Sequence, residues 1–546
     1  MKITKLTTIL IITSMFSSAS LNGQTGYPDP GKRRSAEREM AAAYPDLCKL
    51  SSAGISAGGT DIPVITIGKG DTGNKPAVAI IGGIDSRYIA GTAIISGFAK
   101  MLLENSKDPE ISALLDRVTF YLLPDINPDA TSAFFSTPSA SVRGNANPWD
   151  EDRDFSVDED PFEDINGDGV ITIMRIEDEA GTHIESGSNS AVMVKADPSK
   201  GEKGKWIIHT EGRDNDGDGL FNEDGPGGVF INNNFSFDYE EWGRNAGIHA
   251  LSENESRAVA DFLYDHYNIF AVVTYGPDDN LSKPWKSAPG QQSSPQQGRQ
   301  RSQIIKNIQR EDETINQMVS ALFLNETGFT GTPYNMRERG NFAEWAYYHY
   351  GRYSFATPGW WVPQTRDLTP EENILKWGSE NGMENLYVDW KPVEHPDFHG
   401  KKVEVGGIKP FVMTTPPESM LGEITEKNYN FLVKLAGMHP DPVLTGLRVE
   451  HLEKDLYRIS VTLHNNSMLA TTNELGDRNK WNRRMVITLE GGNDLTFISG
   501  KPKEITGRLK GNETREYNWV VRGRGEITIN AGAVNTGFSS VSTSLK

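Results

Sequence analysis

The sequence predicts an α/β domain, a mixed sheet between helices, followed by a small all-β sandwich domain. Three observations carry this prediction. Residues 77–104 and 252–276 each combine a strand pattern with a helical one, and the strand pattern of the first is wholly apolar. A third apolar stretch, at 118–123, ends in turn residues. After residue 438 the chain changes to short alternating segments separated by Gly and Asn. Apolar strands linked by helices are typical of α/β domains, and short alternating strands are typical of sandwiches.

The α/β elements follow in chain order. "AVAIIGGI" is apolar throughout, as expected for a central strand, and "IAGTAIISGFAKMLLEN" has helical periodicity. "VTFYLLPDINPDA" predicts another buried strand that ends in a turn. "SENESRAVADFLYDH" predicts a helix and "IFAVVTYG" a strand. Further helices are expected near residues 302–323 and about 424–437, and the second of these closes the domain.

The domain boundaries follow from these changes of pattern. Residues 1–23 carry two lysines, a short apolar run and small residues, which predicts a signal peptide and a secreted protein, periplasmic or extracellular. The apolar run is too short for the alternative, a membrane anchor, and no other long apolar segment occurs, so no transmembrane segment is expected. Residues 24–438 form the α/β domain, with an acidic insertion at about 140–228. Residues 439–546 form the sandwich.

Charge and cysteine content exclude several classes of function. The 546 residues carry a net charge of −19, which argues against nucleic acid and anionic membranes as partners. Cys48 is the only cysteine, so neither an internal disulfide nor a zinc cluster of several thiolates can form.

The acidic insertion contains loops with the spacing of calcium ligands. Oxygen ligands at every second position, followed by a glycine, are how a loop wraps calcium. Two loops fit this spacing, one with Asp164, Asn166 and Asp168, the other with Asp214, Asp216 and Asp218. A weaker copy has Asp150, Asp152 and Asp154, with Phe155 in place of the glycine. Calcium would be structural here, ordering an insertion that otherwise lacks a core. Solvated acidic loops are the alternative.

Several segments together resemble the M14 zinc carboxypeptidase family (carboxypeptidase A-like). They are "GGIDSRYIAG", "FYLLPDINPDA", "GGVFINNNFSF", "SENESRAVADFL" and "GNFAEWAYYHYGRYSFATPG". Their order and spacing extend the resemblance over about residues 45–435. The resemblance implies a mixed eight-stranded sheet between helices, with the site at the carboxyl ends of the strands. The acidic insertion and the C-terminal sandwich are additions to that fold.

The resemblance also locates the positions that carry the family's chemistry, and here they hold other residues. The two positions of the first zinc-binding motif are Asp85 and Tyr88. The second zinc-binding histidine falls at Val273 or Thr274, and the general-base glutamate at Thr357 or Pro358. The arginine that grips a terminal carboxylate falls at Asn233. Zinc is therefore not expected, although it is typical of the family, and Asp85 is the one residue here that could serve as a ligand.

Other site positions retain polar groups. Arg87, Arg143, Asn232 and Tyr334 match ligand-contacting groups of the family, and with Asn233 they form the candidate binding set. They predict a cleft for a peptide-like or small anionic ligand. The alternative is scaffold, in which Arg87 pairs with an acid and Asn232 satisfies backbone groups.

Three functions remain open from the sequence. The first is a secreted M14-type protein without its zinc centre, a pseudoenzyme that binds a ligand. The second is a hydrolase with an unusual site, built on Asp85, Arg87 and Tyr88. The third is a structural or adhesive surface protein whose C-terminal sandwich makes the contact.

Overall fold

The computed structural model describes residues 27–150, 153–222, 224–225, 227–287, 305–334 and 337–546. The predicted signal peptide, residues 1–23, and Asp152 of the third acidic loop lie outside these residues. Within them, no helix is both long enough and apolar enough to cross a lipid bilayer.

The α/β domain is organised around one mixed sheet with the strand order β1-β2-β4-β3-β9-β10. β3, β4, β9 and β10 are parallel, and β2 is antiparallel to both of its neighbours. β3, β4 and β10 are buried along their whole length, as their apolar sequences predict. The strands are β1 (Cys48–Ile55), β2 (Asp61–Ile67), β3 (Ala77–Ile81), β4 (Thr119–Leu123), β9 (Ile269–Tyr275) and β10 (Tyr353–Thr357).

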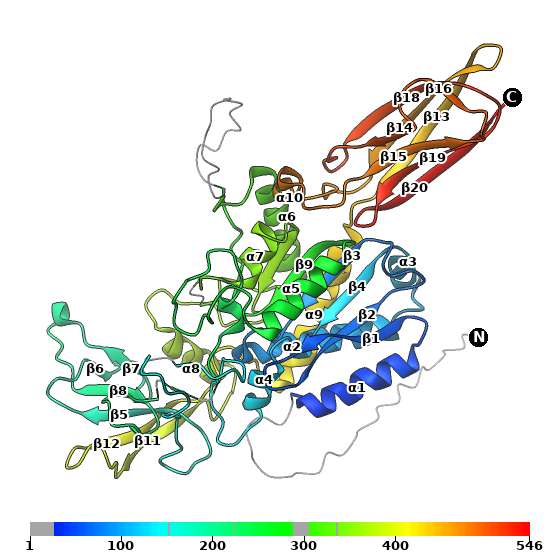
Figure 1. The fold of residues 1–546 in the computed structure, drawn as a ribbon. Coiled ribbons are helices and arrows are strands. Elements are labelled where there is room, and N and C mark those ends of the chain that lie inside the picture. Colours follow the sequence, from blue (N-terminus) through cyan, green and yellow to red (C-terminus); the bar gives the residue numbers. More distant parts are fainter. Residues whose placement is uncertain (1–26, 151–152, 223, 226, 288–304, 335–336) are drawn as a thin grey trace, which may run out of the picture.

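Helices cover both faces of this sheet and bury two hydrophobic cores (Figure 1). One core contains residues of α2 (Ile89–Glu104), α3 (Pro109–Arg117), α6 (Arg310–Thr327), α8 (Pro370–Glu380) and α9 (Glu418–Gly437). The other contains residues of α5 (Asn254–Asp265) and α7 (Phe342–Tyr348). Smaller elements are α1 (Pro30–Ala43), α4 (Pro128–Phe134), η1 (Ser86–Tyr88), η2 (Pro198–Lys200) and η3 (Ile231–Asn233).

Two predicted helices have different limits in the structure. The helix expected at 302–323 begins at Arg310. Its first turn contains three acidic residues, which suit the positive end of the helix dipole. It ends at Thr327, because Gly328 adopts the left-handed conformation (φ 66°) that closes a helix. The helix expected at 424–437 begins earlier, at Glu418, directly after Pro417.

Within the part of the chain that the structure describes, the main sheet has six strands where the resemblance implied eight. The loop after β9 closes the edge at β10, because the backbone amide of Asn280 donates to the carbonyl of Ala356. The Asn280 side chain also accepts from the amide of Ala356 and donates to the carbonyl of Ser354. The strands that follow β10 in the sequence pair elsewhere, so the sheet does not extend past this edge.

The acidic insertion contributes to a second sheet, of order β11-β12-β5-β8-β6-β7. Its core includes Met174 and Ile176 of β5 and Val403 and Val405 of β12, so the expectation that the insertion lacks a core was wrong. The core was missed because half of it comes from residues far downstream. The strands are β5 (Ile173–Glu177), β6 (His183–Glu185), β7 (Met193–Lys195), β8 (Trp206–Thr210), β11 (Tyr387–Val393) and β12 (Val403–Ile408).

The C-terminal residues form a separate domain of two antiparallel four-stranded sheets with a core of their own, at the opposite end of the molecule from the second sheet (Figure 1). One sheet has the order β13 (Pro442–Glu453), β14 (Leu456–Asn465), β18 (Thr514–Arg522), β16 (Thr496–Ser499). The other has the order β17 (Lys503–Ile505), β15 (Val486–Gly491), β19 (Gly525–Ala533), β20 (Gly537–Leu545). The short α10 (Glu474–Asn479) contacts α6 of the α/β domain.

Candidate ligand-binding site

The site lies where β3, β9 and β10 end side by side. Asp85 follows β3 after a tight turn at Gly82 and Gly83, and Gly83 adopts φ 64°. A Cβ atom at Gly83 would lie 2.4 Å from a carboxylate oxygen of Asp125, so only glycine fits there. The turn brings the end of β3 against the end of β4 and directs the chain into η1 and α2.

An ion-pair network surrounds Asp85, which is 2 % exposed. Arg87 donates from Nε to Oδ1 (3.0 Å) and from Nη2 to Oδ2 (2.7 Å), and its backbone amide also donates to Oδ1 (3.0 Å). Arg143 donates from Nε to Oδ2 (2.9 Å) and from Nη2 to both carboxylate oxygens of Glu338 (2.7 and 2.9 Å). Both oxygens of Asp85 are therefore engaged, and the formal charges of the four side chains cancel.

The ionisation states follow from this environment. Burial raises the pKa of Asp85, but the charges of Arg143 and Arg87 outweigh burial and hold the pKa below its ordinary value. Burial also raises the pKa of Tyr88, so its phenol is neutral at physiological pH. Asp85 is thus a fixed anion and a very weak base, and Tyr88 is a buried neutral side chain.

The other positions identified through the resemblance are buried and carry no strong base. Val273 is fully buried in a hydrophobic core. Thr274 is 1 % exposed, and its hydroxyl has no hydrogen-bond partner among the described residues. The Thr357 hydroxyl accepts from the amide of Gly359 (3.1 Å), and Pro358 is buried beside it.

These side chains do not suit a zinc ion. A zinc site needs about three nitrogen, oxygen or sulfur ligands and an open position. The oxygens of Asp85 are occupied by two arginines, and the neighbouring phenol is protonated. Across the described residues, the two groups of three ligand-type side chains that lie within 4.8 Å of one another contain only carboxylates of the insertion. No imidazole group belongs to either of them.

A second polar contact lies beside the network, between Asn232 and Asp278. The Asn232 amide donates to Oδ2 of Asp278 (3.0 Å) and accepts from the backbone amide of Phe342 (3.1 Å). Burial raises the pKa of Asp278 to about 8, although the hydrogen bond from Asn232 opposes the rise. The scaffold interpretation of Asn232 is thus correct for one of its two bonds, and the other bond holds a carboxyl group at the site.

The remaining two candidate ligand-binding residues, Asn233 and Tyr334, take no part in the ion-pair network described above. Asn233 ends η3, and its side-chain oxygen is buried without a hydrogen-bond partner among the described residues. Tyr334 is 54 % exposed. The structure therefore brings Arg87 and Arg143 together on Asp85 and places Asn232 against Asp278.

Sequence reasoning missed Glu338 and Asp278. Glu338 lies in a loop 195 positions from its partner Arg143, and no local pattern indicates that contact. Asp278 could have been identified from the sequence. It lies shortly after the strand at 269–275, at the carboxyl end where α/β folds place their ligands.

The acidic loops of the insertion turn as their spacing predicts. The carboxylate of Asp214 accepts from the amides of Gly217 and Gly219, and that of Asp164 accepts from the amides of Asp168 and Gly169. Gly169 and Gly219 have φ angles of 83° and 94°, which explains the glycine at the sixth position.

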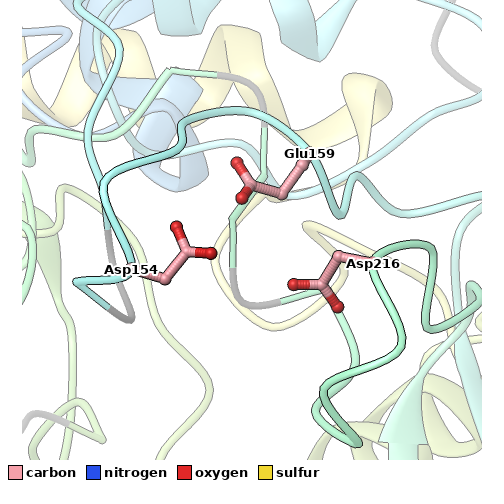
Figure 2. A group of neighbouring side chains, drawn as sticks. All are labelled: Asp154, Glu159 and Asp216. Atoms are coloured by element: carbon pink, nitrogen blue, oxygen red, sulfur yellow. The ribbon is translucent and has the colours of Figure 1, made fainter.

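One carboxylate is shared between two acidic groups. Asp216 lies within 4.8 Å of Asp214 and Asp218, measured between one oxygen of each. It also forms a group with Asp154 of the weaker loop and Glu159, and Figure 2 shows these three side chains directed toward a common space. The second and third acidic loops therefore meet, which their sequences alone did not predict.

Two segments of the chain match known family models. Residues 34–195 match the family model described as zinc carboxypeptidase, and residues 442–544 match a family described as a domain of unknown function. These matches confirm the resemblance found in the sequence and the separate character of the C-terminal domain.

Individual relatives cover short parts of the chain. Carboxypeptidase B of Astacus astacus is 29 % identical over 112 residues, which is 20 % of this chain and 36 % of that protein. The inactive metallocarboxypeptidase ecm14 of Talaromyces marneffei is 31 % identical over 98 residues, 17 % of this chain and 16 % of that protein. The chain thus covers about a third or less of the curated relatives named here. The structure of carboxypeptidase A from Helicoverpa armigera aligns with a TM-score of 0.42 at 10 % identity, over 75 % of this chain and 72 % of that one.

Proposed function

The chain is a relative of the zinc carboxypeptidases, and we propose that it has exchanged the metal centre of that family for ion pairs and binds a peptide-like ligand without cleaving it. The observation that carries this proposal is the engagement of both Asp85 oxygens by Arg87 and Arg143. No acidified water and no general base are available at the positions that would supply them. One matched relative is itself named as inactive.

The same network favours a peptide-like ligand over a small anion. Arg87 and Arg143 were the expected anion-binding groups, but Asp85 and Glu338 neutralise them. A hydrolase built on Asp85 and Tyr88 is also disfavoured, because both groups are held in unreactive protonation states. The N-terminal segment makes export the expected location.

Metal analysis tests this proposal directly. Protein purified in zinc-containing buffer and then dialysed is expected to retain far less than about one zinc per chain, since the site lacks the ligands. It should release no C-terminal residue from a panel of peptides, and chelator should change nothing. Stoichiometric zinc together with chelator-sensitive release of C-terminal residues would refute the proposal.

Calcium is the metal that we propose for the insertion. Hard carboxylate and amide oxygens at every second position suit this ion, and two loops contribute to the group around Asp216. Calcium would join the segments at residues 154–159 and 214–219, and its role would be structural. The hydrophobic core of the second sheet accounts for the rest of the order in this region.

Calcium is expected to raise the thermal stability of the protein. A free calcium concentration about a hundredfold above Kd stabilises a folded protein by about 2.7 kcal/mol, which shifts Tm by a few degrees. Differential scanning calorimetry with calcium and with chelator measures the shift. Asp216→Asn should remove most of it, because Asp216 belongs to both groups, whereas the exposed Asp265→Asn on α5 should retain it. Equal Tm values with calcium and with chelator would contradict the site.

A further inference from the structure

A pocket of about 400 Å³ opens beside the end of β9. The loop after β9 forms one wall, with Asp278 and Trp285, and the start of α7 with Arg337 forms the other. Trp285 is held in place by Tyr347 and Tyr348, whose rings lie 5.9 and 6.4 Å from its own. The pocket is large enough to receive one long side chain of a ligand.

The charged groups of the pocket differ in how well they are satisfied. Glu344 pairs with Arg337 through two hydrogen bonds (2.7 and 2.8 Å), so the charges of these two side chains neutralise each other. Lys283 and Lys286 also line the pocket, but both are exposed to solvent, so their long side chains can extend into water. Asp278 is more than nine-tenths buried, and its Oδ1 has no hydrogen-bond partner among the described residues. Asp279 also lines the pocket, and its carboxylate accepts from the amides of Leu281 and Ser282 and from the Ser282 hydroxyl. Among the carboxylate oxygens of the described pocket residues, Oδ1 of Asp278 is therefore the one without a hydrogen-bond partner.

The contact with Asn232 also determines what the pocket excludes. By the resemblance, Asn232 matches an amide next to the position that grips a terminal carboxylate, and that position is Asn233 here. The Asn232 amide already donates to the carboxyl group of Asp278. A free carboxylate entering this place would have to displace Asp278 from the Asn232 amide, and Asn233 offers no positive charge to hold it there.

We propose that this pocket receives an ammonium or guanidinium group of a peptide-like ligand, paired with Asp278 and packed on Trp285, and that it rejects a free carboxylate. The inference rests on the proposed function and adds the chemical class of the ligand. Pairing a cation with the unsatisfied oxygen completes the hydrogen bonding of Asp278. The indole face of Trp285 supplies a favourable surface for the cation and its aliphatic stem.

Binding of such a cation is coupled to a proton. Burial raises the pKa of Asp278 to about 8, so the empty pocket holds a neutral carboxyl group at pH 7. An incoming cation favours the ionised form and expels the proton into solvent. Affinity should therefore rise with pH up to about 8 and then level off.

Isothermal titration calorimetry of the full-length protein tests this with three probes: agmatine, arginine, and arginine acetylated at its amine and amidated at its carboxylate. Agmatine and the blocked arginine are expected to bind, with affinity at pH 8.5 about 25-fold above that at pH 6.5, the ratio of the ionised fractions of a carboxyl group with a pKa of about 8. At pH 7 each should release about one proton, read from buffers of different ionisation enthalpy. Arginine, which keeps its carboxylate, should bind more weakly than agmatine.

Asp278→Asn is expected to weaken agmatine binding at least tenfold and to abolish the pH dependence, while its amide oxygen can still accept from Asn232. Asp261→Asn, on the exposed side of α5, is the control and should bind like the parent. Failure of all three probes to bind, unchanged binding by Asp278→Asn, or tighter binding of arginine than of agmatine would overturn the inference. None of these outcomes restores zinc or hydrolysis, so the proposed function fails by different measurements.

Discussion

Asp85→Ala is expected to lower the free energy of unfolding by about 3–5 kcal/mol, measured by urea denaturation. The substitution removes the anion that satisfies Arg87 and Arg143, whose side chains are 30 % and 17 % exposed. It also deletes the acceptor of the Arg87 backbone amide at the start of η1. Two cations would then share Glu338, which is 3.7 Å from Arg87 and bonded to Arg143.

Two further variants distinguish the loss of negative charge from the loss of a hydrogen-bond acceptor. Asp85→Asn keeps an acceptor for the backbone amide and should lose less than the alanine variant. Glu338→Gln, at a residue that is 21 % exposed, should cost about 1 kcal/mol, because solvent replaces part of the lost interaction. A cost below about 1 kcal/mol for Asp85→Ala would show that the network does not hold the site together, and with it the main support for the proposed function would weaken.

The α/β domain could largely be predicted from the sequence. Ala77–Ile81 is a wholly apolar run and Ile269–Tyr275 is apolar except at Thr274, and such runs have few stable positions other than the centre of a covered sheet. The number of strands could not be predicted, because the edge at β10 is closed by Asn280, a single side chain in a loop. Local patterns do not reveal which residue will close an edge.

The second sheet was hidden for a different reason. β6 and β7 have three residues each, too few to show a period, and β5 finds its partner β12 more than two hundred positions downstream. Its stability also depends on Arg175, which lies between the rings of Trp206 and Trp390 at 4.3 and 4.1 Å. Such contacts depend on the folded arrangement and leave no periodic trace in the sequence.

The candidate site could be predicted in part. Asp85 and Arg87 are two positions apart, and their pairing was the scaffold alternative that the sequence already offered. The resemblance supplied Arg143 and Asn232, but their partners Glu338 and Asp278 come from loops that carry no common motif. Residues present at a site could thus be identified, whereas the charges that neutralise them required the structure.

Asp125→Ala is the second variant with a large expected cost, about 3–5 kcal/mol. Asp125 follows β4 and is fully buried, and its Oδ2 accepts from Nη2 of Arg33 at 2.6 Å. Arg33 is 1 % exposed, and its Nε and Nη1 have no hydrogen-bond partner among the described residues. Without Asp125, a buried guanidinium would retain only Glu37, 3.6 Å away. The exposed Glu39→Ala on the same helix should change stability by less than about 0.5 kcal/mol.

The cost of Asp125→Ala should depend on pH through Glu37. Burial raises the pKa of Glu37 from 4.5 to about 7, the charge of Arg33 opposes this, and the charge of Asp125 adds to it. In the parent, protonated Glu37 therefore favours the folded state most below pH 4.5, and this contribution fades as pH rises through 7. Removing Asp125 lowers the pKa of Glu37 and lets it ionise beside Arg33. Urea denaturation should give a cost about 1 kcal/mol larger at pH 5.5 than at pH 7.5, and a cost that grows with pH would show that Glu37 does not take over as counterion.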